Sequence, residues 1–263
     1  MSNRWIAPAI IAAVTIITFL PALYAASFFD DAQNLADNPQ FRAFGFDYLP
    51  WAFTTFYNGH YRPLLWLSLG LDYVLWGGLD SFGFHLTNLF IHAANAVLFF
   101  FVAQRLIVLA LPEAAEGESW RLTVASAFAA MFFSLHPLQT EVLAQITGRK
   151  ESLATFFFLW VVWFYLQGRI RPAAIFYLLS LLSKSAGGAV AAPLALFILD
   201  KYPLRRKTLE LKNKIPFVLL SGSFAVVALL VKNDAGQVVV SLDAYPFMER
   251  FLQALYMPGF SFG

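Results

Sequence analysis

The sequence predicts an all-α polytopic membrane protein, a bundle of transmembrane helices with one large extracytoplasmic loop. Of its 263 residues, 59% are hydrophobic and only 13% are charged, whereas about 25% of the residues in a soluble domain are charged. Apolar runs recur along the chain, and the longer ones can cross a hydrocarbon core of about 30 Å as helices. Cysteine is absent, which excludes disulfides and thiolate metal sites. No nucleic-acid partner is expected.

Breaks in hydropathy divide the chain into candidate spans. The run at 5–26 follows Arg4 and is long enough to cross a bilayer. A cleaved signal peptide is the alternative, but its apolar core would be about 7 to 15 residues long, and further apolar runs follow here. The short pieces at 173–182 and 186–199 can form a hairpin that crosses the bilayer incompletely. The predicted spans are 5–26, 84–111, 122–135, 152–167, 173–182, 186–199 and 215–231.

The distribution of charge orients these spans. The segment 201–214 carries six basic residues and one acid, and cytoplasmic loops of membrane proteins collect Lys and Arg. Because Arg4 is also expected inside, an even number of crossings must separate the two. The ambiguous apolar segment 64–79 is therefore expected to lie along the outer surface as an interfacial helix.

This topology gives the outer face the long loop 27–83 and the shorter segments 136–151 and 233–263. The long loop is rich in aromatic residues, which settle at membrane interfaces, so we expect it to fold onto the membrane. No repeat, low-complexity tract or linker divides the chain. We therefore expect one domain over 1–263, a multi-pass membrane protein with its candidate site on the extracytoplasmic face.

Two adjacent carboxylates, Asp30 and Asp31, follow the first span directly. An acid pair at the outer membrane surface suggests chemistry on a membrane-borne substrate. Neighbouring side chains in a helix point about 100° apart, so both cannot address one atom. We expect one aspartate to act and the other to support it. The alternative is that either simply caps a short helix, which is a common use of Asp.

A polar stripe opens the span at 84–111. His85, Asn88, His92 and Asn95 recur at spacings of three, four and three, which places them on one helix face. Polar side chains in a span normally face the bundle interior, so the stripe marks the inward face. A zinc site is conceivable, but the two histidines are seven residues apart and no acid shares the stripe. Hydrogen bonding between helices is therefore favoured.

Basic side chains gather at the outer face against the positive-inside bias. Arg149 and Lys150 precede a span at its outer end, so something should hold them there. Binding a phosphate is one reason, and pairing with Glu141 or Glu151, or with lipid headgroups, is the other. Arg62 and Lys184 add two more cations to this face. Cations beside a carboxylate fit transfer from a lipid phosphate, because cations stabilise the leaving phosphate while a carboxylate takes the acceptor proton.

Several motifs, in this order, resemble those of TMTC-type protein O-mannosyltransferases and their bacterial relatives, members of the GT-C glycosyltransferase superfamily. The likeness covers residues 30 to about 200. The motifs are Phe28-x-Asp30-Asp31, Tyr61-Arg62-Pro63-Leu64, Gly83-Phe84-His85-Leu86-Thr87-Asn88 with His92, His136-Pro137-x-x-Thr140-Glu141, Gly148-Arg149-x-Glu151 and Leu182-Ser183-Lys184.

The resemblance implies an inverting transferase that moves a mannose-like hexose from a polyprenyl- or dolichyl-phosphate donor to a glycan or protein hydroxyl. Asp30 or Asp31 would be the base. Arg62, Arg149 and Lys184 match basic positions of the family, and we infer phosphate binding for them. Other matching polar positions are interpreted as site architecture; they are His85, Asn88, His92, His136 and Glu141.

The chain departs from the family at two points. Ser185 stands where a glutamate usually follows the lysine, which removes a potential partner of Lys184. The further spans and C-terminal tetratricopeptide repeats of the family do not occur before Gly263, so we expect an incomplete chain with doubtful activity in isolation. A non-catalytic scaffold or pseudoenzyme of the same fold is the alternative, and a transporter is a third. No cofactor is expected, although two carboxylates can hold Mg²⁺ or Mn²⁺.

Overall fold

The computed structural model of the chain describes residues 5–25, 31–42, 45–113, 119–185, 191–206, 211–234, 246, 248–250 and 252–253. Within these ranges every regular element is a helix, and three or more of them are apolar enough to cross a membrane. The prediction of an all-α membrane protein is confirmed. Helices lie at each range where the sequence predicts a span. The crossing itself and its direction stay predictions.

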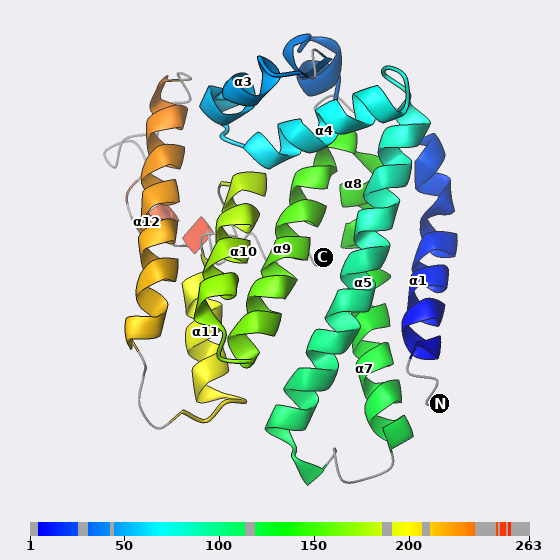
Figure 1. Cartoon of the computed structure of the whole chain (residues 1–263), viewed down its shortest axis with the longest axis vertical. Coiled ribbons are helices and arrows are strands. Elements are labelled where there is room, and N and C mark those ends of the chain that lie inside the picture. The colour runs from blue at the N-terminus through cyan, green and yellow to red at the C-terminus, as the bar shows by residue number, and fades with distance from the viewer. Residues whose placement is uncertain are drawn as a thin grey trace.

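Upright helices form the bundle (Figure 1). They alternate in direction along the chain, so their connections fall at two opposite ends. Two of their boundaries follow from local chemistry: the Asp80 carboxylate caps the start of α5 by accepting from the Gly83 N–H at 3.3 Å, and Gly168, with φ 72°, follows the end of α9. The upright helices are α1 (Ile6–Phe19), α5 (Ser81–Ala110), α7 (Ser119–Ser134), α9 (Arg149–Leu166), α10 (Ile170–Ser183), α11 (Ala192–Lys201) and α12 (Leu211–Asp234).

Three of the described helical segments have the length and hydropathy to cross a bilayer, namely Ile6–Tyr24, Ser81–Ala110 and Leu211–Val231. A fourth is possible if α7 and the short α8 (Leu138–Ala144), which meet at a bend of 57°, count as one span. α11 has ten residues, about 15 Å at 1.5 Å per residue, which is half of a hydrocarbon core. By its length, α11 cannot cross alone.

The segment between α1 and α5 covers one end of the bundle. Its longest helix, α4 (Pro63–Leu75), begins at a proline, which suits the first helical position. α4 lies across the upper ends of α5 and α9 rather than parallel to them (Figure 1). The shorter pieces of this segment are α3 (Tyr48–Thr54), the π-helical turn η2 (Ala32–Ala36) and the 3-10 turns η3 (Gln40–Arg42) and η4 (Tyr57–Gly59).

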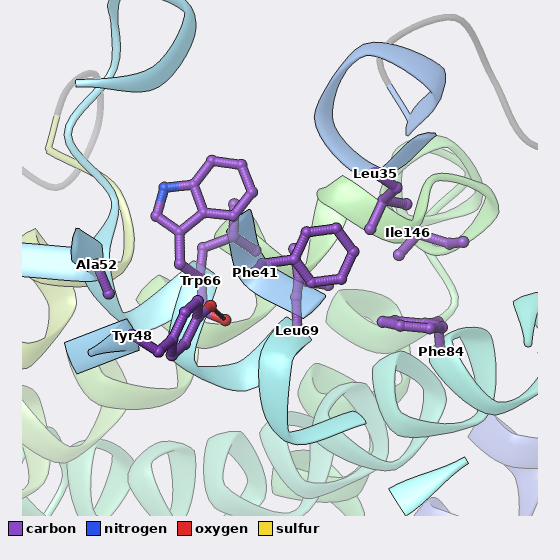
Figure 2. Packing of buried hydrophobic residues seen from close by; sticks show 9 residues of the cluster. Leu35, Phe41, Tyr48, Ala52, Trp66, Leu69, Phe84 and Ile146 are labelled. Atoms are coloured by element: carbon purple, nitrogen blue, oxygen red, sulfur yellow. Dashed lines mark hydrogen bonds between the residues drawn. The ribbon is translucent and has the colours of Figure 1, made fainter. Parts of the chain in front are cut away.

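A buried aromatic cluster fastens this covering segment to the bundle. Phe41, Trp66 and Leu69 are fully buried in it, and Phe84 of α5 closes it from below (Figure 2). The Tyr48 hydroxyl donates to the Trp66 carbonyl at 2.5 Å, and burial raises the pKa of this phenol. Such rings bury large apolar areas and favour edge-to-face contacts, so the segment is a packed layer over the helix ends.

An ion cluster ties α9, α11 and α12 together at the opposite end. Asp200 pairs with the ammonium of Lys214 and, at 3.3 Å, with Arg206; it also accepts from the Tyr165 hydroxyl at 2.7 Å. The sequence assigned Lys214 to a cytoplasmic loop, but α12 begins at Leu211 and buries it. Burial of a lysine is tolerated here because a carboxylate compensates its charge.

Candidate functional site

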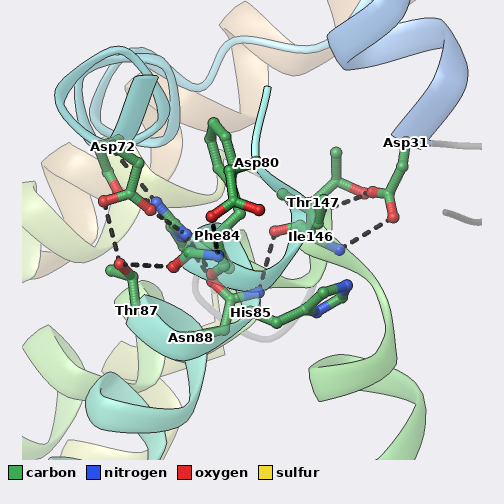
Figure 3. A network of polar contacts seen from close by, with 12 residues as sticks. Asp31, Asp72, Asp80, Phe84, His85, Thr87, Asn88, Ile146 and Thr147 are labelled. Carbon is green, nitrogen blue, oxygen red and sulfur yellow. Dashed lines mark hydrogen bonds and ion pairs between the residues drawn. The ribbon is translucent and has the colours of Figure 1, made fainter. Parts of the chain in front are cut away.

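The Asp31 carboxylate holds the turn that precedes α9. Its Oδ1 accepts from the Thr147 backbone N–H at 2.8 Å and from the Thr147 hydroxyl at 2.9 Å, and its Oδ2 accepts from the Ile146 N–H at 3.0 Å (Figure 3). The side chain is buried and makes no capping bond to η2. Asp31 therefore does not serve as a helix cap. With both oxygens engaged, Asp31 has the geometry of a support; Asp30 lies outside the described residues.

The turn held by Asp31 packs closely against the backbone of Val142. η5 (Ile146–Gly148) leads directly into α9. A Cβ added to Gly148 would lie 2.0 Å from the carbonyl oxygen of Val142, well inside contact distance. Only glycine fits without moving the backbone, so Gly148 sets where the first turn of α9 begins.

The polar stripe of α5 binds the backbone of the segment 134–152. The Asn88 amide donates to two carbonyls, those of Gln145 and Ile146, both at 3.1 Å. His85 Nδ1 and His92 Nε2 each face a carbonyl oxygen, at 3.1 and 2.9 Å. Since a carbonyl only accepts, each of these ring nitrogens carries a proton. Asn95 donates to a further carbonyl at 2.9 Å. The predicted hydrogen bonding by this stripe is confirmed, and no three potential metal ligands cluster among the described residues.

Arg149 is fully buried and uses its whole guanidinium inside the protein. Nε donates to the Asn88 amide oxygen at 2.6 Å, and Nη1 donates to the hydroxyl and the carbonyl of Ser68 at 3.0 and 3.2 Å. Nη2 donates to the Phe84 carbonyl at 2.7 Å and lies 2.6 Å from the Asp72 carboxylate. Four hydrogen bonds and the ion pair with Asp72 thus give all three guanidinium nitrogens partners inside the protein. This buried, paired geometry is that of a structural arginine rather than of the phosphate ligand that the sequence suggested.

Asp72 completes this network from α4. Its carboxylate accepts from the Thr87 hydroxyl at 3.0 Å and pairs with Arg149, which joins α4, α5 and α9 at one point (Figure 3). Burial raises the pKa of the Asp72 carboxyl above its ordinary value, while Arg149 and Thr87 act in the opposite direction. The apolar segment 64–79 carries an acid because this acid neutralises a buried arginine.

Three cations meet at a second place, a cavity of about 80 Å³. Arg62 precedes α4, Lys150 belongs to the first turn of α9, and Lys184 follows the end of α10. We call this cavity the basic pocket. Its lining residues are His60, Arg62, Lys150, Lys184 and Ser185. The structure thus brings together Arg62 and Lys184, as the sequence suggested, and adds Lys150 in place of Arg149.

Lys184 has a carboxylate partner. Its ammonium nitrogen lies 2.6 Å from both oxygens of Glu151, and the two side chains are 31% and 34% exposed. The expectation that Ser185 removes a partner for Lys184 is thereby qualified, because α9 supplies one from 33 positions away in the chain. The sequence interpretation did not predict that His60 and Ser185 line this pocket. Their only signal is adjacency to motif residues, which does not show where they point.

His136 and Glu141 lie elsewhere. The His136 ring packs against Phe132 with its centroid 5.8 Å away, and it lines an apolar hollow on α7. Glu141 is exposed on α8. Within the described contacts, neither residue binds Asp31 or Arg149 or lines the basic pocket. A separate, mostly apolar pocket of about 170 Å³ adjoins Asp31; its other lining residues are Ala32, Leu35, Ala36, Leu79, Ser81, Phe84 and Ile146.

The chain is similar in sequence to several protein O-mannosyl-transferases. The Homo sapiens protein O-mannosyl-transferase TMTC4 is 37% identical over 100 residues, which are 38% of this chain and 13% of that protein. The Drosophila melanogaster protein O-mannosyl-transferase Tmtc2 is 30% identical over 146 residues, 52% of this chain and 14% of that protein. A Caenorhabditis elegans protein O-mannosyl-transferase is 28% identical over 200 residues, 72% of this chain and 27% of that protein.

No protein-family model matches the chain, and no solved structure matches it significantly. The chain spans about a quarter or less of the length of these relatives. The relatives nevertheless all carry the same kind of name, and one of them matches nearly three quarters of this chain. The resemblance seen in the ordered motifs is confirmed: the chain is similar to protein O-mannosyl-transferases of the TMTC type.

Proposed function

We propose that this chain is the membrane part of an inverting GT-C-type glycosyltransferase. It would move a mannose-like hexose from a polyprenyl- or dolichyl-phosphate donor to an acceptor hydroxyl, such as that of a protein Ser or Thr. Two observations support the proposal: the names of the relatives, and the presence of a basic pocket at the same end of the bundle as the Asp31-held turn.

The basic pocket carries most of the proposal. Arg62, Lys150 and Lys184 reach one small cavity from three separate segments. Cationic donors of this kind form short, charge-assisted hydrogen bonds to phosphate oxygens. A lipid phosphodiester carries one negative charge, whereas the monoester that leaves carries about −1.5 to −2. The cations therefore stabilise the departing phosphate more than the bound donor, which is the condition for catalysis.

The reaction needs one base. The acceptor hydroxyl gives its proton to a carboxylate while its oxygen bonds to the anomeric carbon. The bond from that carbon to the phosphate oxygen breaks, and the phosphate keeps the electron pair. We assign Asp30 as the base, because both oxygens of Asp31 are occupied by the turn before α9. Asp31 would orient Asp30 and fix the turn that carries Lys150. The proposal assigns charge stabilisation to protein cations rather than to a divalent metal.

The proposed side of the membrane follows from charge. The described parts of the basic segment, 201–206 and 211–214, lie at the end of the bundle opposite the basic pocket, and cytoplasmic loops are rich in Lys and Arg. We therefore assign the basic pocket and the Asp31-held turn to the extracytoplasmic face. The resemblance to bacterial relatives of the TMTC-type enzymes favours a bacterial inner membrane.

A transfer assay tests the proposal. Membranes containing the full chain receive radiolabelled polyprenyl-phosphate mannose or glucose with a Ser/Thr-containing acceptor. We expect Asp30→Asn to abolish transfer, and Asp31→Asn to reduce it by loosening the turn. Asp47→Asn, which alters an exposed carboxylate of the same outer segment, is the matched control and should leave transfer unchanged. Unchanged transfer in both aspartate variants would refute the assignment of a catalytic role to this pair. A transporter predicts solute flux without a glycosidic product, and a scaffold predicts neither.

A further inference from the structure

We propose that Glu151 is a specificity-determining residue of the basic pocket. It limits the affinity of the pocket for a doubly charged phosphate monoester relative to a singly charged diester. The inference rests on the proposed function, in which the donor is a diester and the lipid product is a monoester. A residue that disfavours the second negative charge would help the product to leave.

The geometry places this carboxylate next to the pocket without making it part of the lining. Lys184 lines the cavity, while Glu151 holds the same ammonium at 2.6 Å through both carboxylate oxygens. A phosphate in the cavity would therefore contact the Lys184 ammonium directly, and this ammonium would separate it from the Glu151 carboxylate. Glu151 acts on such a ligand through its charge and through the position of Lys184.

Glu151 lies beside the pocket because of its position in the first turn of α9. Successive helix positions point about 100° apart, so Arg149, Lys150 and Glu151 address three different neighbours. Arg149 points into the network with α4 and α5, Lys150 lines the basic pocket, and Glu151 reaches Lys184. Glu151 contributes one negative charge beside the three cations that line the pocket. Its replacement by Gln would remove that charge.

The size of the effect follows from the distances. With 2.6 Å on one side of the ammonium and a hydrogen bond of about 3 Å on the other, a bound phosphate would lie about 6 Å from the carboxylate charge. At that separation, each additional negative charge on the ligand costs about threefold in affinity with water-like screening, and about tenfold at half that dielectric constant. The pair is about one third exposed, so screening in this range is appropriate.

Binding measurements on the purified full chain in nanodiscs test the inference. The probes are farnesyl phosphate and its methyl diester, used at pH 8, where the monoester is doubly charged because its second pKa is about 6. The readout is the ratio of the two dissociation constants. Displacement of Lys184 would weaken the doubly charged monoester more than the diester and shift the ratio against the monoester, whereas loss of the negative charge of Glu151 shifts it toward the monoester.

We expect Glu151→Gln to shift the ratio about threefold to tenfold in favour of the monoester. Glu151→Asp, which keeps the charge, should leave the ratio close to that of the wild type. Glu113→Gln, which alters an exposed carboxylate after the far end of α5, is the matched control and should not change it. An unchanged ratio in Glu151→Gln, with the wild type binding both probes, overturns this inference and leaves the proposed function standing. Failure of the wild type to bind either probe overturns both.

Discussion

Replacing Arg149 by methionine should destabilise the protein strongly. The change removes all five donors of a fully buried guanidinium and leaves the Asp72 carboxylate without its counter-charge. Breaking one partner of a buried ion pair costs about 3–5 kcal/mol. For a domain of this size, 1 kcal/mol corresponds to about 2–4 °C in Tm. We therefore expect a fall in Tm of about 6–20 °C.

A double-mutant cycle separates the charge from the rest of the network. In Arg149→Met/Asp72→Asn both charges of this pair are removed, and the amide oxygen at position 72 can still accept from the Thr87 hydroxyl. The double variant should therefore be more stable than Arg149→Met alone, with a coupling of about 1–3 kcal/mol between the two sites. Arg105→Met, which changes an exposed arginine of α5, is the matched control and should stay within about 0.5 kcal/mol of the wild type.

Thermal unfolding of the purified protein in detergent, followed by tryptophan fluorescence, measures these changes. A loss below about 1 kcal/mol in Arg149→Met, or a double variant no more stable than the single one, would refute the buried-pair reasoning. Arg149→Lys gives a further comparison. If Arg149 were a phosphate ligand, this variant would keep its stability and bind farnesyl phosphate more weakly. The structure predicts instead that Arg149→Lys lowers stability and that any weakening of phosphate binding accompanies this loss, because lysine cannot reproduce the fork of five donors.

Two further predictions use the same assay. Gly148→Ala places a Cβ 2.0 Å from the Val142 carbonyl oxygen. Because the backbone must move, we expect the free energy of unfolding to fall by about 1–3 kcal/mol and sugar transfer to be reduced. Wild-type stability of this variant would show that the turn before α9 is not tightly packed. Asp200→Asn leaves the Lys214 ammonium buried without its counter-charge, and should cost about 3–5 kcal/mol. Adding Lys214→Met to Asp200→Asn should recover part of that loss, and no recovery would contradict the pairing.

Much of the fold is predictable from the sequence because it depends on local patterns. Apolar runs, the stripe of polar residues in α5 and the proline at the start of α4 all act within a few positions of the chain. The spacing of the stripe alone shows which face of α5 points into the bundle. Its partners are not visible in the same way, because they are backbone carbonyls of a segment that lies about 50 residues further along the chain.

The candidate site was harder to predict because long-range partners decide the role of each charge. Asp31 and Arg149 are typical catalytic and phosphate-binding residues by type and position. The structure gives Asp31 partners about 115 positions away, and it gives Arg149 an acid from α4. Lys150, adjacent to Arg149, points instead into the basic pocket. One helix step of about 100° separates a structural cation from a candidate ligand, and no local pattern distinguishes the two.

The first turn of α9 is where structure and proposed chemistry depend on each other. Asp31 fixes the backbone just before it, Gly148 allows the close approach, and Arg149 anchors it to α4 and α5. A turn held by three buried contacts can present Lys150 and Glu151 with little loss of conformational entropy when a ligand binds. The buried charges of this end therefore need not touch a substrate to affect turnover. Because their loss would displace Lys150 and Glu151 together, variants of Asp31 or Arg149 should alter phosphate binding and stability in parallel, whereas variants of Glu151 should separate the two.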